Sequence, residues 1–392
     1  MLSFLASRPW WFPDHKTSLA ALYATESLRN FGLSLVGIFI PIYIWQFTGN
    51  FFWLPAYIFI ASVSILIFTF PFIALIRKIG IFKSVFLSNI LRLVLLGALL
   101  YAPQFLPLLV LAAVLEGILI PTYWIPYHFI YCKEGTDGAF GRQIGLMGMF
   151  SVGASFLAPL LGGLVISQFG FPALYVLGIV IILISSLPLG FARDHLEIEA
   201  ISSFSDIVRG FLAKEDRPVF LGLSSLRVAA TVESFLIWPI FLFTVVDSFA
   251  VLGGIASALT LFWLVAVGPI STSIDKLGFK KALWVGSGTS ALFWGTVGFA
   301  TSVPAVFGLA LARTIFSPFL GITPDVIVYT IARSSKILDF IVRRELAIHV
   351  GGLFAAIVIA GLWALFPANW PVLFSVGAAG SMGAVLIAYS KK

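Results

Sequence analysis

Seven charged side chains stand inside stretches of the sequence that are otherwise apolar. On insertion scales a charge costs about 2.5–3.5 kcal/mol at the centre of a helix that crosses a membrane, so each charge needs a partner, water or a function. Carboxylates in such places can take up and release protons, and arginines can bind anions or balance the acids. The set is typical of a charged, water-filled pathway. Its members are Glu26, Arg29, Arg92, Glu116, Arg227, Glu233 and Arg313.

Some of these charges also have a purely structural interpretation. Glu26 and Arg29 are three residues apart on one predicted helix and could neutralise each other. Arg92 could extend toward the membrane surface or brace the helices around it. Arg227 and Glu233 are six residues apart, which is about 120° around a helix, so they do not face each other. We therefore expect each of these two to contact another helix.

Glu116 and Arg313 each lie about ten residues into their apolar stretches, near the expected middle of the membrane. Tyr123 and Tyr127 follow Glu116 at a spacing that places all three on one face of a helix. An acid above two phenols suits a polar-aromatic substrate, although packing is the simpler interpretation of the aromatic side chains. We predict that Glu116 and Arg313 face a central cavity from different halves of the protein.

Few other side chains suggest chemistry. His128 and His349 could relay protons, but ordinary hydrogen bonding is the simpler interpretation. Cys132 is the only cysteine, so no intrachain disulfide can form. No phosphate-binding loop, metal-ligand cluster or pair of nucleophile and base is recognisable. The sequence therefore predicts neither a cofactor nor an enzyme.

Long apolar segments carry the charged side chains. Hydrophobic residues make up 60% of the chain and charged residues 10%, where a soluble domain has about a quarter charged residues. About 20 apolar residues cross the hydrocarbon layer as a helix, and a helix satisfies its own backbone hydrogen bonds in lipid. We predict an all-α membrane protein. Its twelve expected spans are 19–44, 53–75, 84–101, 106–130, 144–167, 173–191, 219–245, 250–273, 281–300, 303–323, 346–366 and 370–389.

Lysine and arginine lie almost entirely on one side of this arrangement. Of the 24 basic residues, 20 fall in the two tails or in five alternate loops. By the positive-inside rule these loops and both termini are expected to be cytoplasmic, in a plasma or inner membrane. Because the basic residues are spread over many loops, the net charge of +7 does not indicate nucleic-acid binding.

An internal repeat with an offset of 198 residues divides the chain. The matching segments are 27–29 with 225–227, 77–83 with 275–281, and Pro126 with Pro324. We predict two six-helix halves, 1–192 and 218–392, joined by a cytoplasmic linker at 193–217. Within the linker, helical spacing of apolar residues predicts an amphipathic helix on the membrane surface. These residues are Ile201, Phe204, Val208 and Phe211.

The two halves and two motifs resemble the major facilitator superfamily of secondary transporters. That family carries G-x-x-x-D-[RK]-x-G-[RK]-[RK] after its second and eighth helices. The second-half copy here is Asp275, Lys276, Gly278, Lys280 and Lys281, and the first-half copy is Arg77, Lys78, Gly80 and Lys83. The first copy has Arg77 in place of the acid. Along the fifth span, residues are similar to the motif of the family's drug–proton antiporters, with alanine in place of two glycines: Gly145, Ala154, Ala158, Pro159, Gly162 and Gly163. Small residues at such spacing also let two membrane helices approach closely.

The resemblance implies which helices line the cavity and how the protein opens. Helices 1, 4, 7 and 10 line the cavity in that family, and six of the seven intramembrane charges fall on these helices here. The family's motif loop packs against the other half when the cytoplasmic side is closed. The implied gate pairs are Asp275 with Arg142, and Arg77 with Glu345 in a charge-reversed copy. The alternative is that these loop charges only orient the protein in the membrane.

The favoured function is a monomeric secondary transporter that exports a small organic solute in exchange for protons, by alternating access of its two halves. An uptake permease for a sugar or an organic anion is the alternative, because four intramembrane arginines outnumber three glutamates. The predicted partners are the solute, protons and membrane lipid. A membrane-embedded enzyme or sensor is the third and weakest hypothesis.

Overall fold

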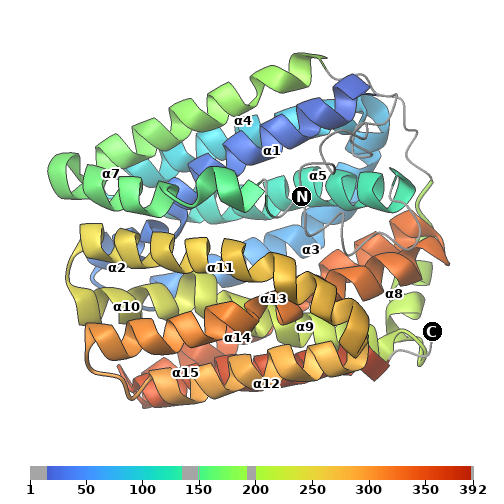
Figure 1. Cartoon of the computed structure of the whole chain (residues 1–392). Coiled ribbons are helices and arrows are strands. Elements are labelled where there is room, and N and C mark those ends of the chain that lie inside the picture. Colours follow the sequence, from blue (N-terminus) through green and yellow to red (C-terminus); the bar gives the residue numbers. More distant parts are fainter. Residues whose placement is uncertain (1–15, 135–148, 150, 192–199, 390–392) are drawn as a thin grey trace, which may run out of the picture.

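The computed structural model describes residues 16–134, 149, 151–191 and 200–389, and these residues form long helices joined by short connections (Figure 1). Ten of the described stretches are long and apolar enough to cross a membrane. One of them, Ser151–Gly190, turns at Gly170, whose φ is 77°, and therefore contains two spans. With Phe279–Val297 as a further helix, the arrangement confirms the predicted twelve-helix, all-α fold.

The first half contains six spans built from the following elements. They are α1 (Lys16–Gly37), α2 (Phe39–Thr48), α3 (Trp53–Ile79), α4 (Ile81–Tyr101), α5 (Pro107–Glu134), α7 (Ala158–Ser185) and the 3-10 helix η2 (Leu187–Phe191). The first span consists of α1 and α2. The helix breaks at Gly37, four residues before Pro41. Proline has no backbone N–H, so Pro41 cannot donate the helical hydrogen bond to the carbonyl of Gly37.

The second half repeats this plan. Its elements are α9 (Arg217–Thr231), the π-helical turn η3 (Val232–Leu236), α10 (Trp238–Val246), α11 (Phe249–Leu277), α12 (Phe279–Val297), α13 (Val303–Arg333), α14 (Ile337–Leu365), α15 (Trp370–Gly383) and the 3-10 helix η4 (Ala384–Tyr389). The short helix α8 (Phe204–Leu212) precedes them, within the segment predicted as the linker. The seventh span is continuous through α9, η3 and α10. Its widened turn precedes Pro239, the repeat equivalent of Pro41.

Two helices of the second half extend beyond their predicted spans. The helix α13 continues to Arg333, although the apolar segment ends near 323, and α14 begins at Ile337 rather than at 346. Both extensions remain helical because the helices continue to pack on neighbours after the apolar run has ended. The extensions place Asp325, Arg344 and Glu345 inside helices rather than in or beside a loop.

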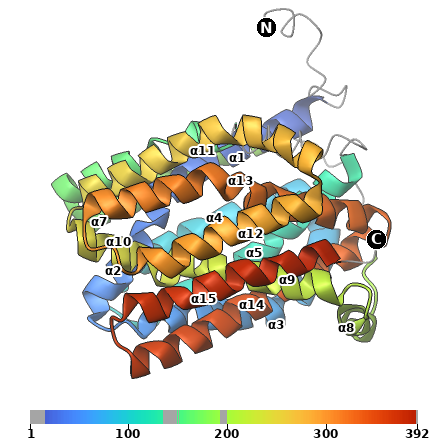
Figure 2. The same ribbon diagram turned by 60° about the horizontal axis from the view of Figure 1, so that its bottom comes forward.

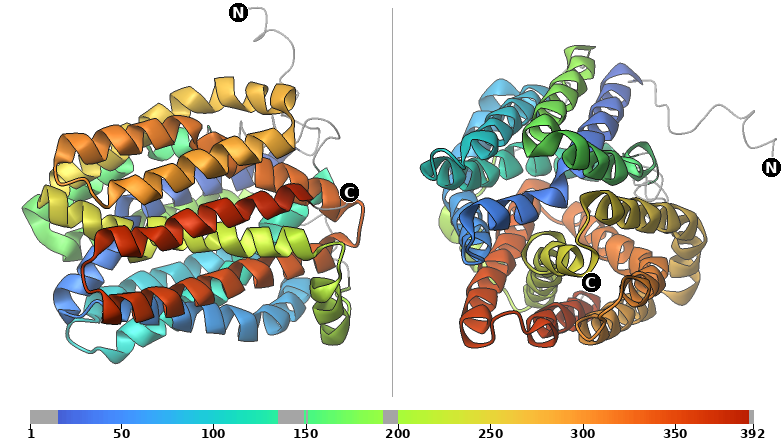
Figure 3. Two further views of the ribbon diagram at one scale, coloured as in Figure 1. Left: turned by 90° about the horizontal axis from the view of Figure 1, so that it is seen from below. Right: turned by 90° about the vertical axis from the view of Figure 1, so that its left-hand side faces the viewer.

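The two halves lie side by side, with the blue-to-green helices on one side and the yellow-to-red helices on the other (Figure 3, right). Within each half, α1 packs on α7 and α9 packs on α14. Between the halves, α7 contacts α11 and α3 contacts α14, and Figure 2 shows α7 and α11 together at one edge of the bundle. We call the end of the bundle where α8 lies the linker end, and the end with α2 and α10 the opposite end (Figure 1).

Small residues allow the close contacts of α7. A Cβ on Gly162 would lie 2.3 Å from the carbonyl oxygen of Leu35 in α1, and one on Gly163 would lie 2.2 Å from that of Phe249 in α11. Ala158 and Pro159 are buried in the same segment. Helix packing within and between the halves thus accounts for the motif residues of α7. Gly145 lies outside the described residues, and Ala154 is exposed.

Candidate functional site

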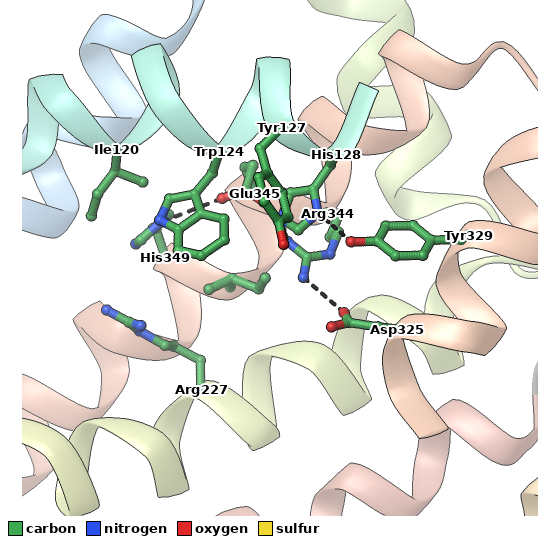
Figure 4. A pocket seen from close by; sticks show the side chains of 11 residues that line it. Ile120, Trp124, Tyr127, His128, Arg227, Asp325, Tyr329, Arg344, Glu345 and His349 are labelled. Atoms are coloured by element: carbon green, nitrogen blue, oxygen red, sulfur yellow. Dashed lines mark hydrogen bonds and ion pairs between the residues drawn. The ribbon is translucent and has the colours of Figure 1, made fainter. Parts of the chain in front are cut away.

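A cavity of about 360 Å³ lies where the first half meets the second (Figure 4). One wall is a single face of α5, and the other walls come from α9, α13 and α14. The volume is at the low end of the range of about 300–1,000 Å³ that small-molecule sites occupy. The lining residues are Ile120, Trp124, Tyr127, His128, Arg227, Asp325, Tyr329, Arg344, Glu345, Ile348 and His349.

Arg344 holds the two acidic side chains of the cavity. Its Nη2 donates to Oδ1 of Asp325 at 3.1 Å, and its Nη1 donates to Oε1 of Glu345. The Glu345 carboxylate also lies near two imidazoles, with Oε1 3.7 Å from Nε2 of His128 and Oε2 3.8 Å from Nε2 of His349. Both acids are therefore engaged with one guanidinium, and one of them is flanked by groups that can exchange a proton.

His128 connects the two halves at the linker end. Nη1 of Arg344 lies 3.0 Å from Nε2 of His128, and Nδ1 of His128 lies 2.6 Å from the hydroxyl of Tyr329. A guanidinium can only donate, so Nε2 must accept and the ring proton must sit on Nδ1, which donates to Tyr329. His128 belongs to α5, whereas its partners belong to α13 and α14. The neutral histidine thus bridges the halves by accepting on one side and donating on the other.

Arg227 extends into the cavity from α9 (Figure 4). Its Nε is buried without a hydrogen-bond partner, and nothing in the described part of the chain forms a hydrogen bond or ion pair with the guanidinium. The side chain passes close to Gly352, where an added Cβ would lie 3.7 Å from Nε and 3.1 Å from Oγ of Ser62. Arg227 is therefore a cavity-lining cation with its hydrogen-bonding capacity largely unused.

The charges of the first span turn inward within their own half. Nη1 of Arg29 lies 3.8 Å from Oε2 of Glu26, and the guanidinium carbon lies 3.6 Å from the ring centroid of Tyr123. Asn30 donates to Glu26 at 3.1 Å. Tyr123 is fully buried and stacks on Tyr127, which does line the cavity. Of these predicted site residues, only Tyr127 is part of the cavity wall.

The other predicted charges form two ion pairs, each inside one half. Arg92 donates to Glu116 at 2.5 and 3.2 Å, and Arg313 donates to Glu233 at 2.6 and 2.5 Å. The Arg313 guanidinium also lies 5.0 Å from the ring of Trp294. Glu116 and Arg313 therefore do not face one another across the cavity described here. Each finds its partner on a neighbouring helix because a doubly hydrogen-bonded pair offsets the cost of both charges.

The expected gate pair of Arg77 with Glu345 is not formed. Arg77 is exposed at the end of α3, whereas Glu345 is 3% exposed and bound to Arg344. The reason is the early start of α14, which places Glu345 two turns into the helix on its inner face. For the second pair, Arg142 and the side chain of Asp275 lie outside the described residues. The remaining motif lysines are exposed: Lys78, Lys83, Lys276, Lys280 and Lys281.

The motif glycines occupy equivalent turns in the two halves. Gly80 joins α3 to α4 with φ of 92°, and Gly278 joins α11 to α12 with φ of 78°. A side chain is strained at such angles, so glycine permits both tight turns. The repeat seen in the sequence therefore has a direct backbone counterpart.

Six of the lining residues were not predicted from the sequence: Ile120, Trp124, Asp325, Tyr329, Arg344 and Ile348. The repeat contained a usable signal, because Pro126 matches Pro324 and the residues after them, Tyr127 and Asp325, therefore correspond. Arg344 carried a weaker signal, since it appeared to belong to a basic loop. Because α14 begins earlier than predicted, Arg344 belongs to this helix and lines the cavity.

Comparison with known proteins supports the fold. No protein-family model matches the sequence, and no curated protein matches it either. An alanine variant of the E. coli fucose:proton symporter FucP superposes with a TM-score of 0.68 at 12% identity, covering 95% of this chain and 98% of that one. FucP in the outward conformation, described as a major facilitator superfamily transporter, superposes with a TM-score of 0.62 at 13% identity and the same coverage. The chain therefore has the major facilitator fold.

Proposed function

We propose that this protein is a secondary active transporter that moves a small organic solute by alternating access, coupled to protons. One observation carries the proposal: the cavity is lined from both halves, and Arg227, which forms no hydrogen bond or ion pair with a described residue, lines it. A site shared by two rigid halves can face either side of a membrane as the halves rock. The solved structures that share this fold include a fucose:proton symporter, which is consistent with this mode of action.

We further propose Glu345 as the proton carrier. Its carboxylate is 3% exposed, lines the cavity and lies close to His128 and His349. Protonation would remove the negative charge that holds Arg344, and so would weaken the Arg344 to His128 bridge between the halves. Arg227 and Asp325 are the other charged groups that line this space. Glu116, the carboxylate that the sequence suggests for this role, is bound to Arg92 and is not among the lining residues.

For direction, we propose export, supported by the antiporter-like spacing along the fifth span. The same small residues have a packing role at α1 and α11, so uptake is a real second candidate. Uptake of an organic anion is favoured by the free guanidinium of Arg227 in the cavity. The two candidates differ in the sign of proton movement when solute flows down its gradient.

Reconstitution into proteoliposomes tests both parts. The internal pH is followed with a trapped pH-sensitive dye while benzoate, fucose or benzylamine is added outside. Solute entry that acidifies the lumen indicates symport, and entry that makes it alkaline indicates exchange for protons. Protein-free vesicles provide the baseline for passive permeation. If no compound in a wider panel of organic solutes changes the dye signal beyond that baseline, in either orientation of the pH gradient, the proposal of a proton-coupled transporter is wrong.

A further inference from the structure

We propose that the cavity binds an organic monoanion with a flat apolar ring, its carboxylate on Arg227 and its ring against the aromatic face of α5. The inference rests on the proposed function and narrows its substrate class. It depends on three features of the cavity: the ion pairs of Arg344 with Asp325 and Glu345, the guanidinium of Arg227, and the aromatic and aliphatic side chains of the wall.

The acidic side chains already share their charge with Arg344, which makes them weak sites for a cationic substrate. Asp325 and Glu345 are both hydrogen-bonded to Arg344, which in turn bonds to His128. A cation in the cavity would compete with Arg344 for these two carboxylates and would lie close to its positive charge. Breaking a buried ion pair in this way is strongly unfavourable. The cavity is therefore poorly suited to a cationic ligand.

Arg227 has the opposite character. Its guanidinium has no hydrogen bond or ion pair to any described residue, and its Nε is buried. Glu116 and Glu345 stabilise its charge only through space. A charge at membrane depth costs about 2.5–3.5 kcal/mol, and an anion bound directly to the guanidinium would offset more of that cost. The planar fork of N–H donors fits a carboxylate through two parallel hydrogen bonds. The anchor thus selects a planar anionic group.

The rest of the wall suits an apolar ring. Trp124, Tyr127 and His128 touch one another through their rings, with centroids 5.2 to 5.5 Å apart. Ile120 and Ile348 add aliphatic surface. The polar groups at the linker end bond to each other, so they offer few free partners to the hydroxyls of a sugar. A volume of about 360 Å³ limits the ligand to a small molecule.

Three probes of one shape test the proposal: benzoate, benzamide and benzylamine carry the same ring with negative, zero and positive charge. Isothermal titration of the detergent-purified full chain should show benzoate binding at least about tenfold more tightly than either of the others, the loss expected when charged hydrogen bonds are removed. Acetate, which keeps the carboxylate without the ring, should also bind more weakly than benzoate. Equal binding of benzamide and benzoate would overturn the anion assignment, and so would tighter binding of benzylamine.

Two variants locate the anion. Arg227→Gln should reduce benzoate affinity to the level of benzamide, whereas Arg209→Gln should leave it unchanged. Arg209 provides the matched control because it loses the same charge from an 81% exposed side chain on α8. Unchanged benzoate binding in folded Arg227→Gln would place the anion elsewhere. If that variant does not fold, the ranking of the three probes on the natural protein still decides the matter.

The outcome for the substrate class is separable from the outcome for transport. Suppose that benzoate binds through Arg227, but that neither benzoate nor any other solute tried crosses the membrane of the proteoliposomes. That result would refute the proposed transport function and support the proposed anion site. If Arg227→Gln transports a neutral solute at an unchanged rate, the transport function is supported and the anion site is refuted.

Discussion

Arg29 and Arg227 occupy the same position in the two halves of the repeat, yet their surroundings are opposite. Arg29 is 2% exposed, lies over Tyr123 and is close to Glu26, so its charge is used inside the first half. Arg227 forms no hydrogen bond or ion pair with a described residue, interacts with Glu116 and Glu345 only at longer range, and reaches into the cavity. The same residue type at one repeat position can thus stabilise a bundle in one half and remain available for a ligand in the other.

The difference extends to the whole cavity. The first half supplies aromatic and aliphatic side chains and one histidine, all from α5, while the second half supplies every arginine and carboxylate of the lining. The backbone is repeated, but the chemistry is divided between the copies. An asymmetric site in a pseudo-symmetric fold can bind an amphipathic solute with its polar end toward one half and its apolar end toward the other.

Replacing Arg227 by glutamine is the strongest test of this contrast. We expect transport to fall by about 10- to 100-fold, because a hydrogen bond to a charged group is worth about 1.5–3 kcal/mol. Thermal unfolding should change little, since the guanidinium forms no hydrogen bond or ion pair with a described residue and would lose only longer-range interactions with Glu116 and Glu345. Initial rates in proteoliposomes and a melting curve measure the two effects. Transport at the natural rate would show that Arg227 is idle.

Glu345→Gln should uncouple solute movement from the pH gradient while solute exchange across the membrane continues. The reason is that a glutamine keeps the shape of the side chain but cannot carry the proton. Counterflow and gradient-driven uptake, measured on the same vesicles, separate the two activities. Glu116→Gln is the companion variant, for which we expect coupling to persist. If coupling is lost in Glu116→Gln and persists in Glu345→Gln, the proton carrier is Glu116, as the sequence suggests.

Arg29→Gln should affect stability more than transport affinity. It leaves Glu26 buried with only Asn30 as a hydrogen-bond donor and removes the contact with Tyr123. We expect a loss of about 1–3 kcal/mol in the free energy of unfolding. Chemical denaturation in detergent measures this loss, and the double variant Glu26→Gln with Arg29→Gln should recover part of it. A folded single variant of natural stability would contradict the structural role of Arg29.

The smallest expected effect is that of Arg77→Glu. Because Arg77 is exposed and does not pair with Glu345 here, the change should alter transport by no more than a few-fold, in line with ~0–1 kcal/mol for exposed ion pairs. Adding Glu345→Arg should make transport worse. Rescue by the second change would instead show that the two residues pair in another conformation, as the family resemblance implies.

Much of the fold could be predicted from local sequence. The spans follow from the length and hydropathy of each segment, and the breaks follow from residues such as Gly170 and Pro239. The repeat offset was equally visible in the sequence, and Gly80 and Gly278, which it pairs, both have positive φ. The predicted end of α13 and the predicted start of α14 were wrong, because a helix can continue past its apolar segment when tertiary contacts support it.

Much less of the candidate site was predictable. The sequence identified which charges stand in the membrane, but it did not assign Arg92 to Glu116 or Arg313 to Glu233. Those choices depend on how far each helix is rotated about its axis and on which neighbour it meets. The same applies to His128 and Arg344, which are 216 residues apart in the chain and 3.0 Å apart in space.

The sequence by itself determined that this chain is a twelve-span, twofold-repeated membrane protein with costly charges in its interior, because hydropathy, proline and glycine act within one segment. Only the tertiary structure decided which intramembrane charges form ion pairs, and that Arg227 forms none with a described residue. Partner choice depends on distances between side chains of different helices, and a rotation or shift of one helix reverses it without changing the hydropathy of any segment. Arg29 and Arg227 therefore have different surroundings, although they occupy equivalent positions in the sequence repeat.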